Sequence, residues 1–107
     1  MRGKLVLPAA AIALMMGTTL GLSQEIGQPG RGLELASRLC AQCHAVRRDQ
    51  SRSPNEQAPR FQEIAAVPGM TALALSAALN TSHRSMPNIV LQASDQTDII
   101  AYILSLK

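Results

Sequence analysis

The sequence has few of the side chains that usually build or staple a small core. Its 107 residues contain no tryptophan, one tyrosine, one phenylalanine and only two cysteines. A short chain buries a modest fraction of its surface, so a core with so few aromatic rings is hard to stabilise. A disulfide between Cys40 and Cys43 would close a tiny loop, which stabilises least. The sequence therefore predicts that a group other than its own side chains completes the core.

A strong charge of either sign is also lacking. Arg2 and Lys4 belong to the N-terminal segment, and without them the chain holds eight Arg plus Lys against seven Asp plus Glu, a net charge of +1. Seven of those eight cations are arginines, and the exception is Lys107. Because nucleic-acid binding needs a dense basic face, this balance excludes a nucleic-acid partner.

Residues 1–23 match the pattern of a secretory signal peptide. A short basic start precedes 18 uncharged residues, and the small residues Gly21 and Ser23 stand just before Gln24. We expect cleavage before Gln24, so that residues 24–107 form one exported domain in the periplasm or an equivalent compartment.

The alternative for this segment is a retained membrane anchor, since its 18 uncharged residues come near the lower limit for a span. Pro8 and Gly17 weaken such a helix, which favours cleavage. Membrane contact is then expected only through partner proteins, or through residues 1–23 if they are retained.

Hydrophobic spacing and helix start signals predict four helices and no strand. Thr71 and Ser94 are the expected N-caps of the last two helices. Residues 24–32, punctuated by Gly and Pro, are expected to form a mobile lead-in. Two polar connections, 47–60 and 81–91, are long for a small domain, and such loops often wrap a ligand. The expected helices cover residues 33–41, 61–67, 72–79 and 95–105.

Both cysteines belong to one short motif, Cys40-Ala41-Gln42-Cys43-His44, which is the attachment pattern of c-type haem. Two intervening residues let the backbone turn enough for both thiols to add to the two vinyl groups on one edge of the porphyrin. The adjacent imidazole then points under the ring and reaches the iron as proximal ligand. The haem would complete the core, packed by Leu39, Phe61, Ile64, Leu75, Leu79, Val90, Leu91 and Ile103.

Two other uses of a Cys-x-x-Cys pair are weighed against haem. A redox dithiol of thioredoxin type lies at a strand-to-helix junction, and no strand precedes this pair. A zinc site needs further ligands, for which His83 is available, but paired cysteine motifs are usual there. The motif with its adjacent histidine favours haem over both.

The second axial ligand of the iron is expected to be Met86, which precedes Pro87 in an irregular loop from which a thioether can approach the metal. Met70 follows a Pro-Gly pair just before a helix and is expected to fill a gap in the core. His83 is the main rival, because bis-histidine haem is common. Ligation by Met70 and an open position are the remaining alternatives.

At these positions the chain resembles the class I cytochromes c. The similar segments are "GLELASRLCAQCH", "NEQAPRF", "HRSMPN" and "DIIAYILSL", and the likeness extends over residues 30–107. The resemblance implies the all-α cytochrome c fold, in which an N-terminal and a C-terminal helix cross around the covalently bound haem.

The resemblance also implies particular contacts. Gly32 would allow the two helices to approach, with Ile99, Ala101 and Tyr102 on the other side. Where the family often has a large aromatic residue, this chain has Ala36, so the crossing should be tighter or packed by leucine. A proline carbonyl accepts the Nδ1–H bond of the proximal histidine in this family. Here that carbonyl belongs to either Pro54 or Pro59.

With both axial positions filled by histidine and methionine, the iron changes oxidation state rather than activating oxygen, and the soft thioether raises its potential. The expected function is one-electron transfer between a redox protein donor and acceptor in transient contacts, not enzymatic catalysis. The alternative is a haem enzyme or sensor with a displaceable distal ligand.

Five arginines lie in the segments expected near the haem, and the ordinary role of each is a solvated loop charge. Arg60 is the favoured candidate for bonding a haem propionate. With a net charge of +1 and two propionates added, we expect docking to depend little on long-range charge. The five are Arg47, Arg48, Arg52, Arg60 and Arg84.

Overall fold

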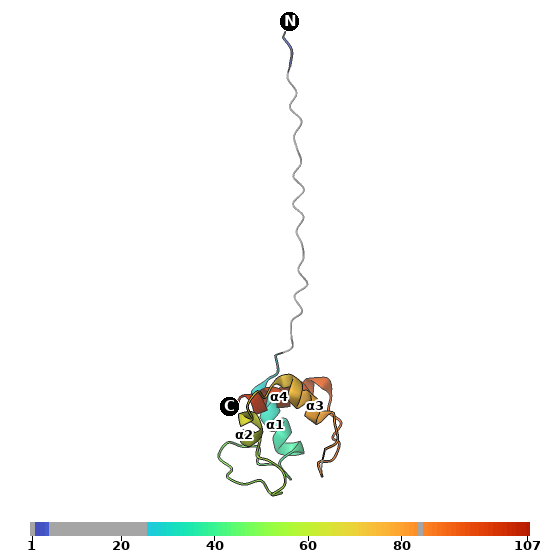
Figure 1. The fold of residues 1–107 in the computed structure, drawn as a ribbon. Helices are drawn as coiled ribbons and strands as arrows, with labels where there is room; N and C mark the ends of the chain where they lie inside the picture. The colour runs from blue at the N-terminus through green and yellow to red at the C-terminus, as the bar shows by residue number, and fades with distance from the viewer. Residues whose placement is uncertain (1, 5–25, 84) are drawn as a thin grey trace.

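The computed structural model of the chain describes residues 2–4, 26–83 and 85–107, and within them it contains four helices and no strand. The predicted all-α fold is confirmed. The predicted signal peptide lies almost entirely outside the described residues. Within them, no helix has the length and apolar character needed to cross a membrane. The helices are α1 (Pro29–Leu39), α2 (Phe61–Ala66), α3 (Ala72–Leu79) and α4 (Ala93–Leu104), shown in Figure 1.

Helix α1 begins earlier than predicted, so the expected lead-in is wrong for residues 29–32. Pro29 is the first helical residue, where its fixed φ suits the helix and its missing N–H costs nothing. The helix start is also held by tertiary contact, because the backbone N–H of Gln28 donates to Asp98 Oδ1 at 2.7 Å. The proline that was interpreted as a turn signal therefore starts the helix.

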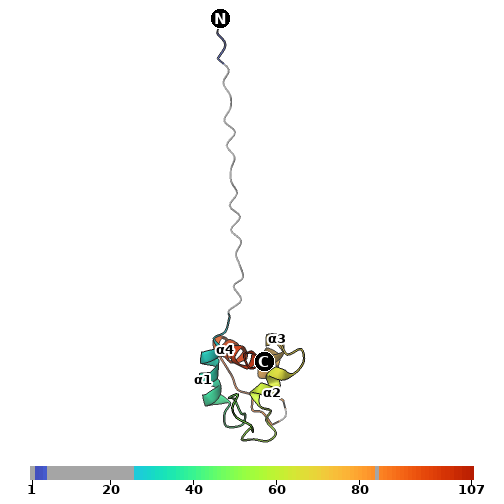
Figure 2. The ribbon, with the colours of Figure 1, turned by 90° about the vertical axis from the view of Figure 1, so that its left-hand side faces the viewer.

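Helices α1 and α4 cross at close range, as Figure 1 and Figure 2 show. A Cβ on Gly32 would overlap the carbonyl oxygen of Asp98 and lie 2.7 Å from the Cβ of Tyr102. The predicted crossing at Gly32 is confirmed, with Tyr102 opposite. Ala101 instead faces a second glycine, Gly27, where a Cβ would lie 2.9 Å from the Cβ of Ala101.

An ion pair also joins the two crossing helices. Arg31 contacts Asp95 at 2.7 Å and Asp98 at 3.0 Å. Of the two carboxylates, Asp95 lies in the first turn of α4, where it also complements the helix dipole. The hydrogen bond to Asp95 is the main reason that the pKa of Arg31 is raised.

The core lies beneath this crossing, and α2 and α3 pack against α4 to close it. Ala36 and Leu35 of α1 are both buried in this core, so alanine and leucine occupy the place of the family's aromatic residue. Val90 was expected in the core, which is wrong, because its side chain is 92 % exposed. The buried apolar cluster contains Leu35, Ala36, Val46, Phe61, Ala65, Leu75, Ile99, Ile100, Tyr102, Ile103 and Leu106.

One of the two predicted helix caps is confirmed. Thr71 Oγ1 accepts a hydrogen bond from the Ala74 N–H at 3.1 Å and caps α3. Ser94 is not a cap, because α4 already begins at Ala93, after the extended backbone of Gln92. The chain enters α4 without a side-chain cap.

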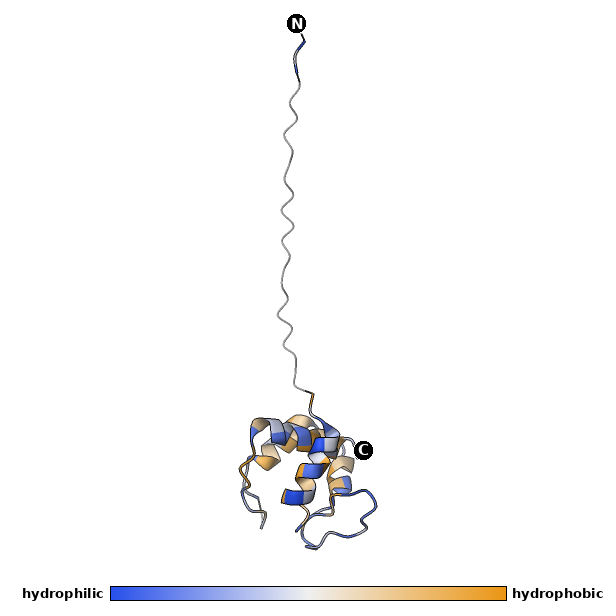
Figure 3. Cartoon of the chain, turned by 180° about the vertical axis from the view of Figure 1, so that it is seen from behind, coloured by the Kyte–Doolittle hydropathy of each residue, from blue (hydrophilic) through white to orange (hydrophobic). Residues whose placement is uncertain are grey.

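The connection between α1 and α2 is polar, which Figure 3 shows along most of its length. It is nevertheless tied to the segment that follows α1. The Ala45 N–H donates to Ser53 Oγ at 3.0 Å, and the Asn55 N–H donates to the Cys43 carbonyl at 3.1 Å. The loop therefore folds back around the cysteine–histidine motif.

Candidate functional site

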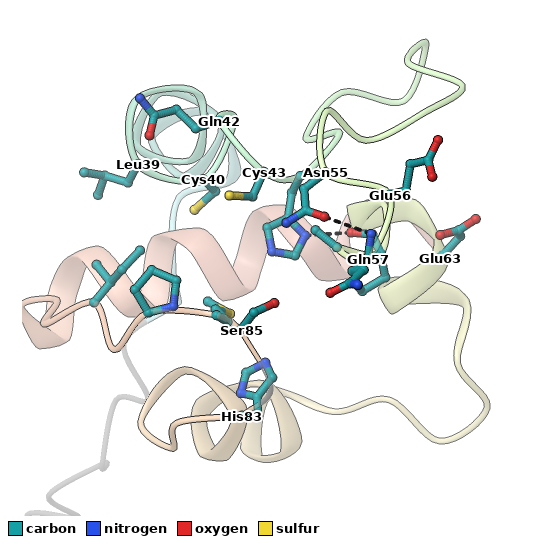
Figure 4. A pocket seen from close by; sticks show the side chains of 16 residues that line it. Leu39, Cys40, Gln42, Cys43, Asn55, Glu56, Gln57, Glu63, His83 and Ser85 are labelled. Carbon is teal, nitrogen blue, oxygen red and sulfur yellow. Dashed lines mark hydrogen bonds between the residues drawn. The ribbon is translucent and has the colours of Figure 1, made fainter.

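A cavity of about 670 Å³ lies between the end of α1, the end of the polar loop and the segment before α4. Its volume falls in the range of roughly 300–1,000 Å³ that small-molecule and cofactor sites occupy. Figure 4 shows Cys40 and Cys43 projecting toward it from the end of α1, with His83 and Ser85 on the opposite side. Leu39 and Ile89 add apolar surface to its wall.

The two cysteines follow directly on α1, and no disulfide joins them. The backbone closes a turn over them, because the His44 N–H donates to the Cys40 carbonyl at 2.9 Å and the Cys43 N–H donates to the same carbonyl at 3.2 Å. This turn directs both sulfurs to one cavity. Burial raises the pKa of the Cys40 thiol to about 11, so before haem is attached that thiol keeps its proton at neutral pH.

His44 is buried, with 8 % of its surface exposed, and it lines the same cavity. Its Nδ1 lies 2.6 Å from the carbonyl oxygen of Pro59. A carbonyl can only accept, so Nδ1 donates, and in the neutral ring Nε2 then keeps its lone pair. This arrangement is typical of a metal-ligating histidine, and of the two candidate prolines the structure selects Pro59.

The aromatic ring of Phe61 also packs on His44, a contact that the sequence analysis did not foresee. The ring centroids are 5.3 Å apart and the planes are tilted by 51°. The Phe61 N–H donates to the Ala45 carbonyl at 3.0 Å. The only sequence signal was that one of the two aromatic residues stands just after Pro59.

Met86 and His83 both line the cavity wall. Met86 is half-buried, whereas His83 is exposed and its Nδ1 lies 3.0 Å from the Thr81 carbonyl. The Met86 N–H donates to the His83 carbonyl at 3.1 Å, which closes a turn. Met70 packs against the core instead, so its predicted role as a gap-filler is confirmed.

The remaining polar part of the wall carries amide and carboxylate side chains, and within the described ranges no arginine lines it. Arg60 pairs with Glu63 at 3.0 Å instead of facing the cavity. Arg48 donates to the Ser105 carbonyl at 3.1 Å. Arg84 lies outside the described residues. None of these positions supports the expected arginine contact with a haem propionate, which stays a prediction.

The zinc alternative finds no support in the described part of the chain, which brings no three His, Cys, Asp or Glu side chains together as a metal-binding group. The residues on the cavity wall fit a haem instead. Cys40 and Cys43 offer free thiols on one side, and His44 offers an imidazole nitrogen beside them.

Comparison with known proteins agrees with this assignment. The chain is 36 % identical over 78 residues to cytochrome c-552 of Bradyrhizobium diazoefficiens, and the match covers 73 % of this chain and 74 % of the relative. No family model matches the chain, and no solved structure matches it. By the identity and coverage of that relative, the chain belongs to the c-type cytochromes. It binds haem c covalently, and it is an electron-transfer protein rather than an enzyme.

Proposed function

We propose that this cytochrome carries single electrons between redox proteins outside the cytoplasm, with Cys40 and Cys43 as the haem attachment sites and His44 and Met86 as the axial ligands of its iron. One observation carries the proposal, which is that these four side chains line a single cavity. The iron of the bound haem supplies the one-electron couple, and the residues of the chain hold and tune it.

The proximal role of His44 is supported by its bond to Pro59. The bond at 2.6 Å fixes the tautomer, leaves Nε2 free as a ligand and raises the basicity of the ring. Because the imidazole is buried, little surrounding water has to reorganise when the iron changes its oxidation state.

The distal role of Met86 is supported by the comparison with His83. Both line the cavity, but the half-buried thioether is the more enclosed of the two side chains. A thioether ligand favours the ferrous state and so raises the potential, which suits an electron carrier. With histidine and methionine on the iron, no position is open for oxygen or peroxide.

The Met86→His variant tests this ligand set. We expect a markedly lower midpoint potential and the loss of the weak ferric absorption at the red end of the spectrum that reports iron–sulfur coordination. His83→Gln and Met70→Leu are the matched controls, and both should keep that band. An unchanged potential in Met86→His would remove Met86 from the ligand set. Absence of the band from the wild-type protein, together with a potential that shifts in His83→Gln, would assign the position to His83.

Carbon monoxide distinguishes a carrier from a haem enzyme or sensor with a displaceable ligand. The reduced carrier, with Met86 on its iron, should bind little carbon monoxide at neutral pH. Ready binding by the wild-type protein would favour the enzyme or sensor. The measurement is the optical spectrum of the reduced protein before and after the gas is added.

Export and partner docking are further parts of the proposal. We expect the native protein to begin at Gln24, and the intact mass of material purified from its own cell would show whether residues 1–23 remain. The net charge of +1 for residues 24–107, with two propionates added, supports docking with little electrostatic steering. A steep fall of the electron-transfer rate with salt would contradict that part.

A further inference from the structure

Two aromatic side chains that do not line the cavity are connected to its histidine. Phe61, at the start of α2, packs on the His44 ring with a centroid distance of 5.3 Å. The ring of Tyr102, on α4, packs on the ring of Phe61. Their centroids are 6.4 Å apart and their planes are tilted by 51°. His44, Phe61 and Tyr102 therefore form a continuous row of rings from the cavity wall to the C-terminal helix.

Hydrogen bonds attach this row to the backbone that directly follows the histidine. The Tyr102 hydroxyl donates to the carbonyl of Val46 at 2.5 Å, and this bond is buried. The Phe61 N–H donates to the carbonyl of Ala45 at 3.0 Å. The two residues that follow His44 are thus each held through their carbonyl by one member of the row.

The same short stretch also holds the histidine ring itself. Pro59 accepts the Nδ1–H bond of His44, and Phe61, two residues further on, covers the ring. The hydrogen bond to Pro59 fixes the direction of the ring edge, and the contact with Phe61 covers one face of the ring. An imidazole held at both edge and face has little freedom to rotate about its own axis.

We propose that Phe61 and Tyr102 are positioning residues, which set the rotation of the His44 imidazole beneath the haem and thereby tune the redox potential. This inference rests on the proposed role of His44 as the proximal ligand. The physical reason is that the partners around a metal-bound histidine determine its orientation and basicity, and through these the properties of the metal. Phe61 contributes the ring contact, and Tyr102 holds both Phe61 and the backbone after His44 in place.

Two conservative variants of the haem-loaded protein test the proposal. Phe61→Leu keeps an apolar side chain but removes the ring, and Tyr102→Phe keeps the ring but removes the bond to Val46. We expect both to change the pattern of haem methyl resonances in the proton spectrum of the ferric protein, which depends on the orientation of the axial imidazole, and to shift the midpoint potential.

Ile100→Ala is the matched control for a loss of stability alone. Ile100 is as buried as Tyr102, at 8 % against 7 % exposure, and lies on the same helix. It does not line the cavity or belong to the row of rings. The control should unfold at lower denaturant concentration but keep the wild-type methyl pattern and potential.

The combined variant Phe61→Leu/Tyr102→Phe shows whether the two residues act as one unit. We expect its shift in potential to differ from the sum of the two single shifts, because contacting residues are coupled. Single variants that match Ile100→Ala in both readouts would overturn the proposal, even where Met86→His behaves as proposed. Failure of the ligand assignment is recognised separately, because the wild-type spectrum itself would then lack the features of imidazole and sulfur coordination.

Discussion

Gly32 of α1 lies directly against Tyr102 of α4, where a Cβ added to the glycine would come within 2.7 Å of the tyrosine Cβ and would overlap the Asp98 carbonyl. Because the overlap is with backbone, it can be relieved only by moving the helices apart. We expect Gly32→Ala to lower the free energy of unfolding of the haem-loaded protein by about 1–3 kcal/mol, the usual cost of overpacking. Denaturant unfolding followed by circular dichroism measures this change.

Gly30 provides the control in the same helix. A Cβ there would meet nothing within 4 Å. Gly30→Ala should therefore be neutral or stabilise by roughly 0.5–1 kcal/mol, since alanine restricts the unfolded chain and is the better helix former. Equal effects of the two substitutions would show that helix propensity, and not the close crossing, determines the result.

The N-terminal ends of α3 and α4 give a second pair of variants. Thr71→Ala removes the acceptor of the Ala74 N–H bond and should cost about 1 kcal/mol of stability. Ser94 resembles a cap in the sequence, but α4 begins before it, so Ser94→Ala should change the free energy of unfolding by less than about 0.5 kcal/mol. A loss at Ser94 equal to that at Thr71 would contradict the described start of α4.

The starts of α3 and α4 illustrate how far local sequence signals predict helix ends. Thr71 was predictable because a Pro-Gly pair ends the preceding helix and leaves a single candidate cap. The start of α4 was not, because the chain arrives there in an extended conformation through Gln92, a residue type without capping preference. Similarly, a proline is common both in turns and at the first position of a helix, so Pro29 alone does not show where α1 begins.

The candidate site likewise has features that the sequence predicts and features that it does not. The spacing of Cys40, Cys43 and His44 is itself the chemical requirement for haem attachment, so the sequence alone predicts it. The partner of His44 was left open between two prolines, because the path of a long loop is set by tertiary contacts. The contact of Phe61 with His44 joins residues 17 apart, and no local pattern encodes it.

Alkaline pH provides a third prediction. Burial is the main cause that raises the pKa of Tyr102 above its ordinary value of 10.0. A group whose pKa is raised in the folded state stabilises fully below the unfolded pKa, and that contribution disappears as the pH rises through the folded pKa. The free energy of unfolding of the wild-type protein should therefore fall with pH above about 10.

The Tyr102→Phe variant isolates this effect, because Tyr102 is the only tyrosine of the chain. The variant should be less stable than wild type at pH 8, where the bond to Val46 counts, and the difference should shrink above the tyrosine pKa. Denaturant unfolding between pH 8 and 12 measures both curves. Parallel curves over the whole range would show that ionisation of Tyr102 is not coupled to folding.

A fourth prediction concerns the contribution of Glu63 to stability at acid pH. Its carboxylate accepts from the Arg60 N–H at 3.0 Å and from the Arg60 guanidinium at 3.0 Å, which holds the first turn of α2. The backbone bond is the main reason that the pKa of Glu63 is lowered from 4.5. A lowered pKa contributes stability above the unfolded value, and that contribution is lost as the pH falls through the folded one.

Glu63→Gln should therefore destabilise the protein at pH 7 and converge with wild type below about pH 4. Glu34→Gln is the control, since Glu34 is exposed on α1, away from this cap. Because α2 begins two residues after Pro59, loosening its first turn should also speed exchange of the His44 Nδ1 proton. Proton exchange measured by NMR at pH 7 would test this link, and an exchange rate equal to that of Glu34→Gln would show that the cap does not support the histidine.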